Sequence, residues 1–214
     1  MKKNFISNKD ETVRMFKSDF MESLSKVHWT VPLIVFVPVI IFFIYRSFFV
    51  LQNSGSVFIL LLIAGLFFWS LTEYSLHRYV FHYEAKSEIG KKMHFIFHGV
   101  HHDYPKDSKR LVMPPSVSLP LATGFYFLFD YILYPYMVPG FFAGFITGYV
   151  FYDTTHYAIH HFNMKSKFWL AIKNHHMRHH YHDPDNGYGV SQPFWDYIFG
   201  TMFKKKTSET VENA

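Results

Sequence analysis

Histidine is the residue type in this chain with the clearest chemical use. The chain has 15 histidines among 214 residues, and most of them fall in four short clusters. Residues three or four positions apart lie on one side of a helix, and neutral imidazole is the commonest metal ligand among side chains. The candidate ligands are His77 and His82; His98, His101 and His102; His156 and His160; and His176, His179 and His180. These clusters predict a metal site built by four segments.

The number of histidines predicts two metal ions. A first-row transition metal takes about four to six ligands, and a catalytic metal must leave a position open. Ten imidazoles exceed what one such ion binds and fit two ions with about five each. Imidazole suits iron, zinc, copper and nickel, and does not suit magnesium or calcium. His77 and His82 are five positions apart, roughly 140° around a regular helix, so we expect them to serve different metals.

The rest of the sequence excludes several other kinds of site. There is no cysteine, which excludes disulfides, iron–sulfur clusters and thiolate-bound metals. The Glu-x-x-His repeats of carboxylate four-helix sites and the H-E-x-x-H motif of metalloproteases are also absent. Ligating histidines usually donate their second ring N–H to a carboxylate or carbonyl. Glu73, Asp153 and Asp103, which lie close to His77, His156 and His102 in the chain, are the carboxylates predicted for that role.

Composition and charge predict a membrane protein. Half of the residues are hydrophobic and 21% are aromatic. A membrane-spanning helix needs about 20 apolar residues, and four apolar runs approach that length with their edges included. They cover about 31–51, 57–71, 117–137 and 140–152. Nearly every Lys and Arg lies outside these runs, in 1–28, 77–116 or 161–206. The positive-inside rule makes those stretches cytosolic, so the net charge of +5 reflects membrane topology and does not indicate nucleic-acid binding.

The predicted fold class is therefore all-α and integral to the membrane. Four transmembrane helices form two hairpins, and a cytosolic helical cap holds the histidine-rich di-metal site. Two alternatives remain open: a soluble all-α protein with very apolar core helices, and a metal transporter or sensor. Uncharged connections at 52–56 and 134–140 argue against the first alternative. The placement of all clustered histidines on one membrane side argues against the second.

Five sequence stretches resemble the fatty acid hydroxylase and sterol desaturase superfamily. They are EYSLHRYVFH (73–82), HGVHHDYPKDSKRLVMPP (98–115), YDTTHYAIHH (152–161), HHMRHH (175–180) and GYGVSQPFWDYIFGT (187–201). The RLVMPP stretch and the glycine–aromatic C-terminal motif resemble, more narrowly, the fatty acid 2-hydroxylases. Sterol desaturation, carotenoid hydroxylation and ether-lipid cleavage are the alternative activities within the superfamily.

This resemblance implies an integral membrane oxygenase with two iron ions. Such an enzyme inserts one oxygen atom from O2 at the α carbon (C2) of a long fatty acyl chain, free or in a sphingolipid or ceramide. The other oxygen atom leaves as water, with the use of two electrons. The implied ligands are the same ten histidines, and the choice of His176 over His175 rests on the alignment. Zinc can replace iron in a purified sample. Lys109 and Arg110 are candidate contacts for the acyl carboxylate, amide or head group.

The resemblance also bears on domains and partners. We expect an N-terminal surface segment (1–28), a membrane-embedded hydroxylase domain (29–206) and a polar tail (207–214). Eukaryotic relatives often carry a fused haem domain, for which residues 1–28 are too short. We therefore expect a separate electron donor, a ferredoxin or cytochrome with its reductase, and a location in a bacterial cytoplasmic membrane. The expected substrate is a long-chain lipid, and no nucleic-acid partner is expected.

Overall fold

Helices form all the regular structure in the computed structural model, which describes residues 4–204. The predicted tail (207–214) lies outside the described residues. The elements are α1 (Asp19–Leu24), α2 (Val31–Tyr45), η1 (Arg46–Val50), α3 (Gly55–Ser75), η2 (Leu76–Phe81), α4 (Glu88–His94), η3 (Phe95–Gly99), α5 (Val100–Asp103), α6 (Pro115–Ile132), α7 (Val138–His161), α8 (Lys167–Tyr181) and α9 (Phe194–Ile198). The three η elements are short π-helical turns. The all-helical prediction is confirmed.

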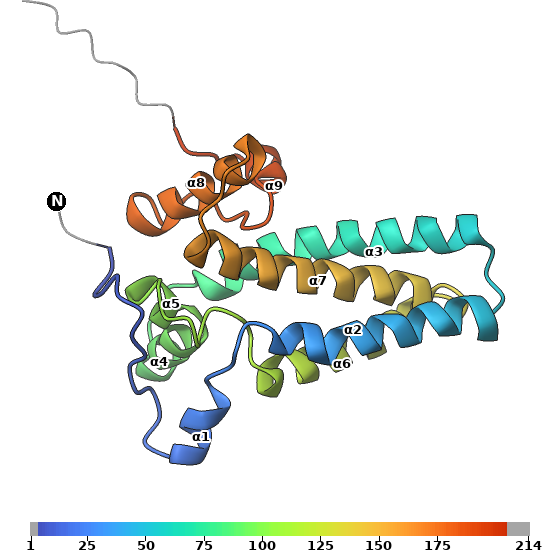
Figure 1. Cartoon of the computed structure of the whole chain (residues 1–214), viewed down its shortest axis with the longest axis horizontal. Helices are drawn as coiled ribbons and strands as arrows, with labels where there is room; N and C mark the ends of the chain where they lie inside the picture. The colour runs from blue at the N-terminus through green and yellow to red at the C-terminus, as the bar shows by residue number, and fades with distance from the viewer. Residues whose placement is uncertain (1–3, 205–214) are drawn as a thin grey trace, which may run out of the picture.

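Four helices run side by side, and the remaining helices lie at one end of them (Figure 1). These four helices are α2, α3, α6 and α7, and the part at their end formed by α4, α5, α8 and α9 is called the cap below. Prolines at the first turns of α2, α6 and α7 help to start these helices, because a proline there removes only an N–H that has no helical partner. Ser54 starts α3 by accepting a hydrogen bond from the Val57 amide.

Two helical segments of the described chain are long and apolar enough to cross a membrane. They are Val31–Val50, which joins α2 to η1, and Gly55–Phe81, which joins α3 to η2. Their surfaces carry exposed large apolar side chains such as Ile34, Ile41 and Leu60, as expected where a helix faces lipid. Helices α6 and α7 lie beside them but are not among the candidate spans. The four-span topology with a cytosolic cap therefore stays a prediction.

Helix α7 is the centre of the bundle, because small residues let it approach α3 closely. Gly140, Gly144 and Gly148 repeat every four residues along α7 and face α3. A Cβ atom at Gly144 would overlap the Leu62 carbonyl, and a Cβ atom at Gly148 would meet the Trp69 side chain at 2.6 Å. Small residues at this spacing are typical of helices that associate inside membranes. The close contact sets the relative positions of the C-terminal ends of α3 and α7, both of which lead into histidines.

The N-terminal segment (residues 4–28) lies along the cap and is bound to it at several points. The amides of Ile6 and Ser7 donate to the Asp103 carbonyl, and the Val27 amide donates to the Lys109 carbonyl. The central attachment is an ion pair between Arg110 and Glu22, 2.6 Å long, whose side chains are 3% and 7% exposed. The segment is therefore a structural part of the cap.

The close contact between α3 and α7 can be tested with one added methyl group. We expect Gly144→Ala to lower the stability of the purified protein in detergent by about 1–3 kcal/mol, the usual cost of overpacking. Gly124→Ala in α6 is the matched control, because its Cβ atom meets nothing within 4 Å. The measurement is the thermal unfolding midpoint of both variants. Equal midpoints for Gly144→Ala and the wild type would contradict this account of the bundle.

Candidate metal centre

The ten predicted ligands come together in two groups of five. The first histidine group is His77, His82, His98, His102 and His179, and the second histidine group is His101, His156, His160, His176 and His180. In each group, one nitrogen of every ring lies within 4.8 Å of the others. All members are buried except His82 and His102, which are half-buried. Histidines 28, 94, 161, 175 and 182 belong to neither group.

His77 and His82 lie in the same group, so the prediction that they serve different metals is wrong. That prediction assumed a regular α-helix, in which a separation of five residues turns the two rings apart. The segment between them is the π-turn η2, and the His82 amide donates to the His77 carbonyl at 3.1 Å. An i→i+5 turn widens the helix and brings these residues to the same side.

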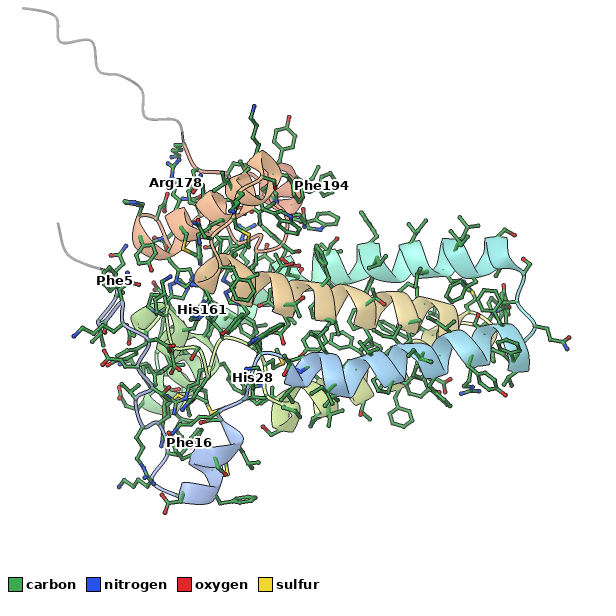
Figure 2. All side chains as sticks on the ribbon, in the orientation of Figure 1. Phe5, Phe16, His28, His161, Arg178 and Phe194 are labelled. Carbon is green, nitrogen blue, oxygen red and sulfur yellow. The ribbon has the colours of Figure 1, made fainter. Side chains whose placement is uncertain are left out.

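The histidines on the cap helices α5 and α8 are shared between the two groups. On α5, His102 joins the first group and His101 joins the second. On α8, His179 joins the first group, whereas His176 and His180 join the second. The two groups are therefore neighbours, and the rings of His102 and His180 stack with their centroids 4.2 Å apart. Figure 2 labels His161 at the end of α7 where these helices meet.

The spacing of the ring nitrogens fits a bound cation. In the second group, Nε2 of His176 lies 3.0 Å from Nε2 of His156, His160 and His180. One proton on His176 can satisfy only one of these three contacts. Nitrogens held about 2.1 Å from one ion at right angles would be about 3.0 Å apart, whereas a tetrahedral ion would separate them by about 3.4 Å. The donors therefore fit a metal with more than four coordination positions.

Burial keeps these imidazoles neutral, as metal binding requires. Burial, with the neighbouring histidines, lowers the pKa of His82 to about 3. Burial also lowers the pKa of His179 to about 4. The pKa of His102 is lowered for the same reasons. At neutral pH each of these rings therefore offers a lone pair to a metal without first losing a proton.

Backbone carbonyls orient two of the ligands. Nδ1 of His77 donates to the Tyr188 carbonyl, and Nδ1 of His179 donates to the Asn186 carbonyl at 2.8 Å. A donating Nδ1 leaves the Nε2 lone pair free for a metal. Both carbonyls belong to the loop of residues 186–191, which is called the carbonyl loop below. The sequence motif at 187–201 includes all of this loop except Asn186, and its spacing gives no sign that backbone carbonyls orient the histidines.

Two buried carboxylates hold the carbonyl loop in place. Asp196 is fully buried and accepts hydrogen bonds from the Tyr188 and Gly189 amides, both at 2.8 Å. Nε2 of His175 lies 3.0 Å from the same carboxylate. Glu73 accepts from the Ser191 amide and hydroxyl at 2.8 and 2.6 Å. The carboxylates therefore act on the histidines through the loop between them.

The three carboxylates predicted to accept hydrogen bonds from the histidines make other contacts. Glu73 binds the carbonyl loop, while the Tyr188 carbonyl takes the place beside His77. Asp153 accepts from the Met113 amide at 3.2 Å and the Tyr149 hydroxyl at 3.2 Å, which joins α7 to the chain before α6. Asp103 accepts amides of the N-terminal segment through its main-chain carbonyl. Glu73 lies one turn before His77 and shares its helix face, but the Tyr188 carbonyl from a distant loop is the group that accepts from the His77 ring.

The two basic residues predicted to contact substrate also differ in environment. Lys109 is exposed. The Arg110 guanidinium binds Glu22 and the Val13 carbonyl, so its charge is already paired. Its buried position beside the N-terminal segment could not be inferred from the RLVMPP motif, because the partner carboxylate is 88 residues away in the chain.

Comparisons with known proteins agree on one family. The fatty acid hydroxylase family model matches residues 62–201. The dihydroceramide fatty acyl 2-hydroxylase FAH1 of Arabidopsis thaliana is 38% identical over 193 residues, which cover 90% of this chain and 81% of the plant protein. The ceramide very long chain fatty acid hydroxylase scs7 of Schizosaccharomyces pombe is 41% identical over 187 residues, covering 86% of this chain and 53% of the yeast protein. This chain thus spans about half the length of the yeast relative.

A solved structure has the same fold. The structure of full-length Scs7p, in which only the hydroxylase domain is visible, superposes with a TM-score of 0.82 at 35% sequence identity. The match covers 88% of this chain and 72% of that chain.

Removing one ligand from each group tests the two-centre assignment. We expect His102→Ala and His180→Ala each to reduce the metal-to-protein ratio, because each variant opens a different group. The measurement is elemental analysis of protein purified with metal. His182→Ala is the control, since His182 is exposed and belongs to neither group. Unchanged metal content in either ligand variant would rule out that group as a metal site.

The carbonyl loop gives a separate prediction. Asp196→Ala leaves the Tyr188 and Gly189 amides without their acceptor, so we expect the loop to shift and metal affinity to fall about 10–100-fold. Asp185→Asn, a change at an exposed residue just before this loop, is the control. Metal affinity is measured by competition with a chelator of known strength. Equal affinities for the wild type and Asp196→Ala would show that the loop does not orient the ligands.

Proposed function

Because the chain belongs to the fatty acid hydroxylase family, we propose that it hydroxylates the α carbon (C2) of long-chain fatty acyl groups. The family is the one that the histidine motifs indicated. The similar proteins are named as dihydroceramide fatty acyl 2-hydroxylases, ceramide very long chain fatty acid hydroxylases and fatty acid 2-hydroxylases. The proposed substrate is accordingly an acyl chain, as a free acid or as part of a ceramide or other sphingolipid.

One observation carries this proposal: an apolar pocket that reaches both histidine groups. Its volume is about 580 Å³, within the range of about 300–1,000 Å³ typical of ligand pockets. Histidines 98, 101 and 156 form part of its wall, so it touches ligands of the first and the second group. Most other lining side chains are apolar, among them Leu76 and Val117. A hydrocarbon chain fits such a pocket, and a polar substrate would leave its own groups unpaired there.

Side chains of the protein would hold the metal ions and the acyl chain in place for the reaction. The two histidine groups would bind two iron ions, which supply the activation of O2 and the transfer of electrons to it. The overall reaction consumes the acyl C–H group, O2, two electrons and two protons, and yields the C2 hydroxyl group and water. The apolar lining, with side chains such as Leu76, Phe81 and Val112, aligns the chain and excludes water from the site. The neutral histidines keep their lone pairs directed at the metal positions.

The remaining proposals concern metal, donor and location. An all-imidazole donor set supports iron and also accepts zinc, so zinc in a purified sample would not identify the working metal. Electrons come from a separate ferredoxin or cytochrome with its reductase. The two apolar helices and the similar lipid hydroxylases support a membrane protein. We place it in a bacterial cytoplasmic membrane, with four spans and the metal site on the cytosolic side.

Lipid analysis of an expressing host tests the function. We expect cells that make long-chain lipids and a competent electron donor to accumulate 2-hydroxy acyl chains, identified by mass spectrometry of hydrolysed lipids. The control is the same host with the His102→Ala variant, which should accumulate none. A hydroxyl group at another carbon, or a new double bond, would replace this proposal with another activity of the superfamily. No modified lipid in the presence of loaded metal and reductant would contradict it.

A further inference from the structure

The N-terminal segment supplies one wall of the apolar pocket. Met15, Phe16, Met21, Leu24 and Ser25 all line it, whereas the pocket's other residues come from positions after 75. Figure 2 labels Phe16 in this segment, next to α1 and below the α4–α5 part of the cap. The sequence had suggested only a surface segment here. Its side chains instead face the space that the acyl chain would occupy.

The wall is fixed in position by the buried Glu22 carboxylate. One oxygen of Glu22 accepts the Met15 and Phe16 amides, both at 3.0 Å, and the other binds Arg110. Burial would raise the pKa of Glu22, but Lys26, these amides and Arg110 lower it to about 2. Glu22 is therefore ionised at neutral pH and joins the wall to the cap. A further bond, from the Ser116 hydroxyl to the Leu24 carbonyl, joins it to α6.

Another part of the pocket lining comes from the turns η2 and η3. Leu76 and Phe81 belong to η2 and Ile96 belongs to η3, the turns that carry His77 and His98 of the first group. The histidines limit where the reacting carbon lies, so the rest of the acyl chain must fit against the other lining residues, which include these turns and the N-terminal segment. Side chains on that segment can therefore change which chains fit without touching the reacting carbon.

We propose that the N-terminal segment determines acyl-chain selectivity, with Phe16 and Met15 as its principal residues. This inference rests on the proposed function. Both side chains are half-buried, apolar and fixed at their backbone by Glu22. Apolar pockets distinguish chains that differ by one methylene group by about 10–200-fold, through space and lost contact area. A smaller side chain at Phe16 admits longer or branched chains, and a larger one at Met15 excludes them.

The test is a competition among acyl substrates in one reaction. The full-length protein, loaded with metal and reductant, receives a mixture of saturated acyl chains of graded length, with one methyl-branched chain. We expect Phe16→Ala to raise the share of long and branched 2-hydroxy products several-fold, and Met15→Trp to lower it. Phe20→Ala is the matched control, because Phe20 lies in the same segment, is 70% exposed and does not line the pocket. Product ratios do not depend on how much of each variant folds.

A second pair of variants tests the role of Glu22. Glu22→Ala removes the acceptor for two amides and for Arg110, so we expect a broader range of accepted chains. Asp19→Ala is its control, since Asp19 pairs with Arg14 on the exposed surface. Ratios that equal the wild-type ratio in Phe16→Ala, Met15→Trp and Glu22→Ala would overturn the proposal. If Phe16→Ala yields no product, the product ratios of Phe16→Leu and Met15→Trp test the proposal in its place.

If the proposed function is wrong, this experiment gives a result that can be told apart from a wrong selectivity proposal. In that case the wild type forms no 2-hydroxy product from any chain. The lengths of acyl chains that copurify with the wild type, Phe16→Ala and Phe20→Ala, measured by mass spectrometry, then decide the selectivity proposal. A shift confined to Phe16→Ala supports it, and identical length profiles overturn it.

Discussion

Convergence of buried imidazole nitrogens is the constraint on which the structure depends. Several pairs of Nε2 atoms lie 3.0 Å apart within each group, for example those of His77 and His98 and those of His156 and His176. Lone pairs directed at one point repel each other unless a cation lies between them. The rings cannot relieve this repulsion by binding protons, because burying a charged imidazole in an apolar site costs free energy. The cap is thus arranged around two positions that favour a positive charge, and the protein's own side chains do not supply that charge.

The helices act as the frame for this arrangement. Of the four segments that carry these histidines, one continues α3 and another is the C-terminal part of α7, and α3 and α7 meet through Gly65, Gly144 and Gly148. Backbone contact between helices allows little sliding, so the ends of α3 and α7 are held at a fixed separation. The π-turns η2 and η3 then adjust the direction of individual histidines, which regular helical geometry could not do.

Buried carboxylates connect the frame to its loops. Glu73 and Asp196 bind the carbonyl loop that orients His77 and His179, and Glu22 binds the N-terminal wall of the pocket. None of the three belongs to a histidine group. Each instead satisfies several backbone amides of a segment without regular structure, which would otherwise be buried without partners. Metal ligands, acyl pocket and surrounding loops therefore depend on one another.

The sequence alone identified the ten clustered histidines, the family and the helical class. Histidine spacing and number can be read from the chain in any fold, and apolar runs of about 20 residues indicate membrane-spanning helices, so these features are local properties of the chain. Only the tertiary structure decided which histidines share a group, because η2 departs from the regular helix that spacing arguments assume. It also decided that a carbonyl orients His77, that Glu22 neutralises Arg110 and that Phe16 lines the pocket. These contacts join residues about 90 or more positions apart or on unrelated elements, and sequence spacing carries no information about such distances.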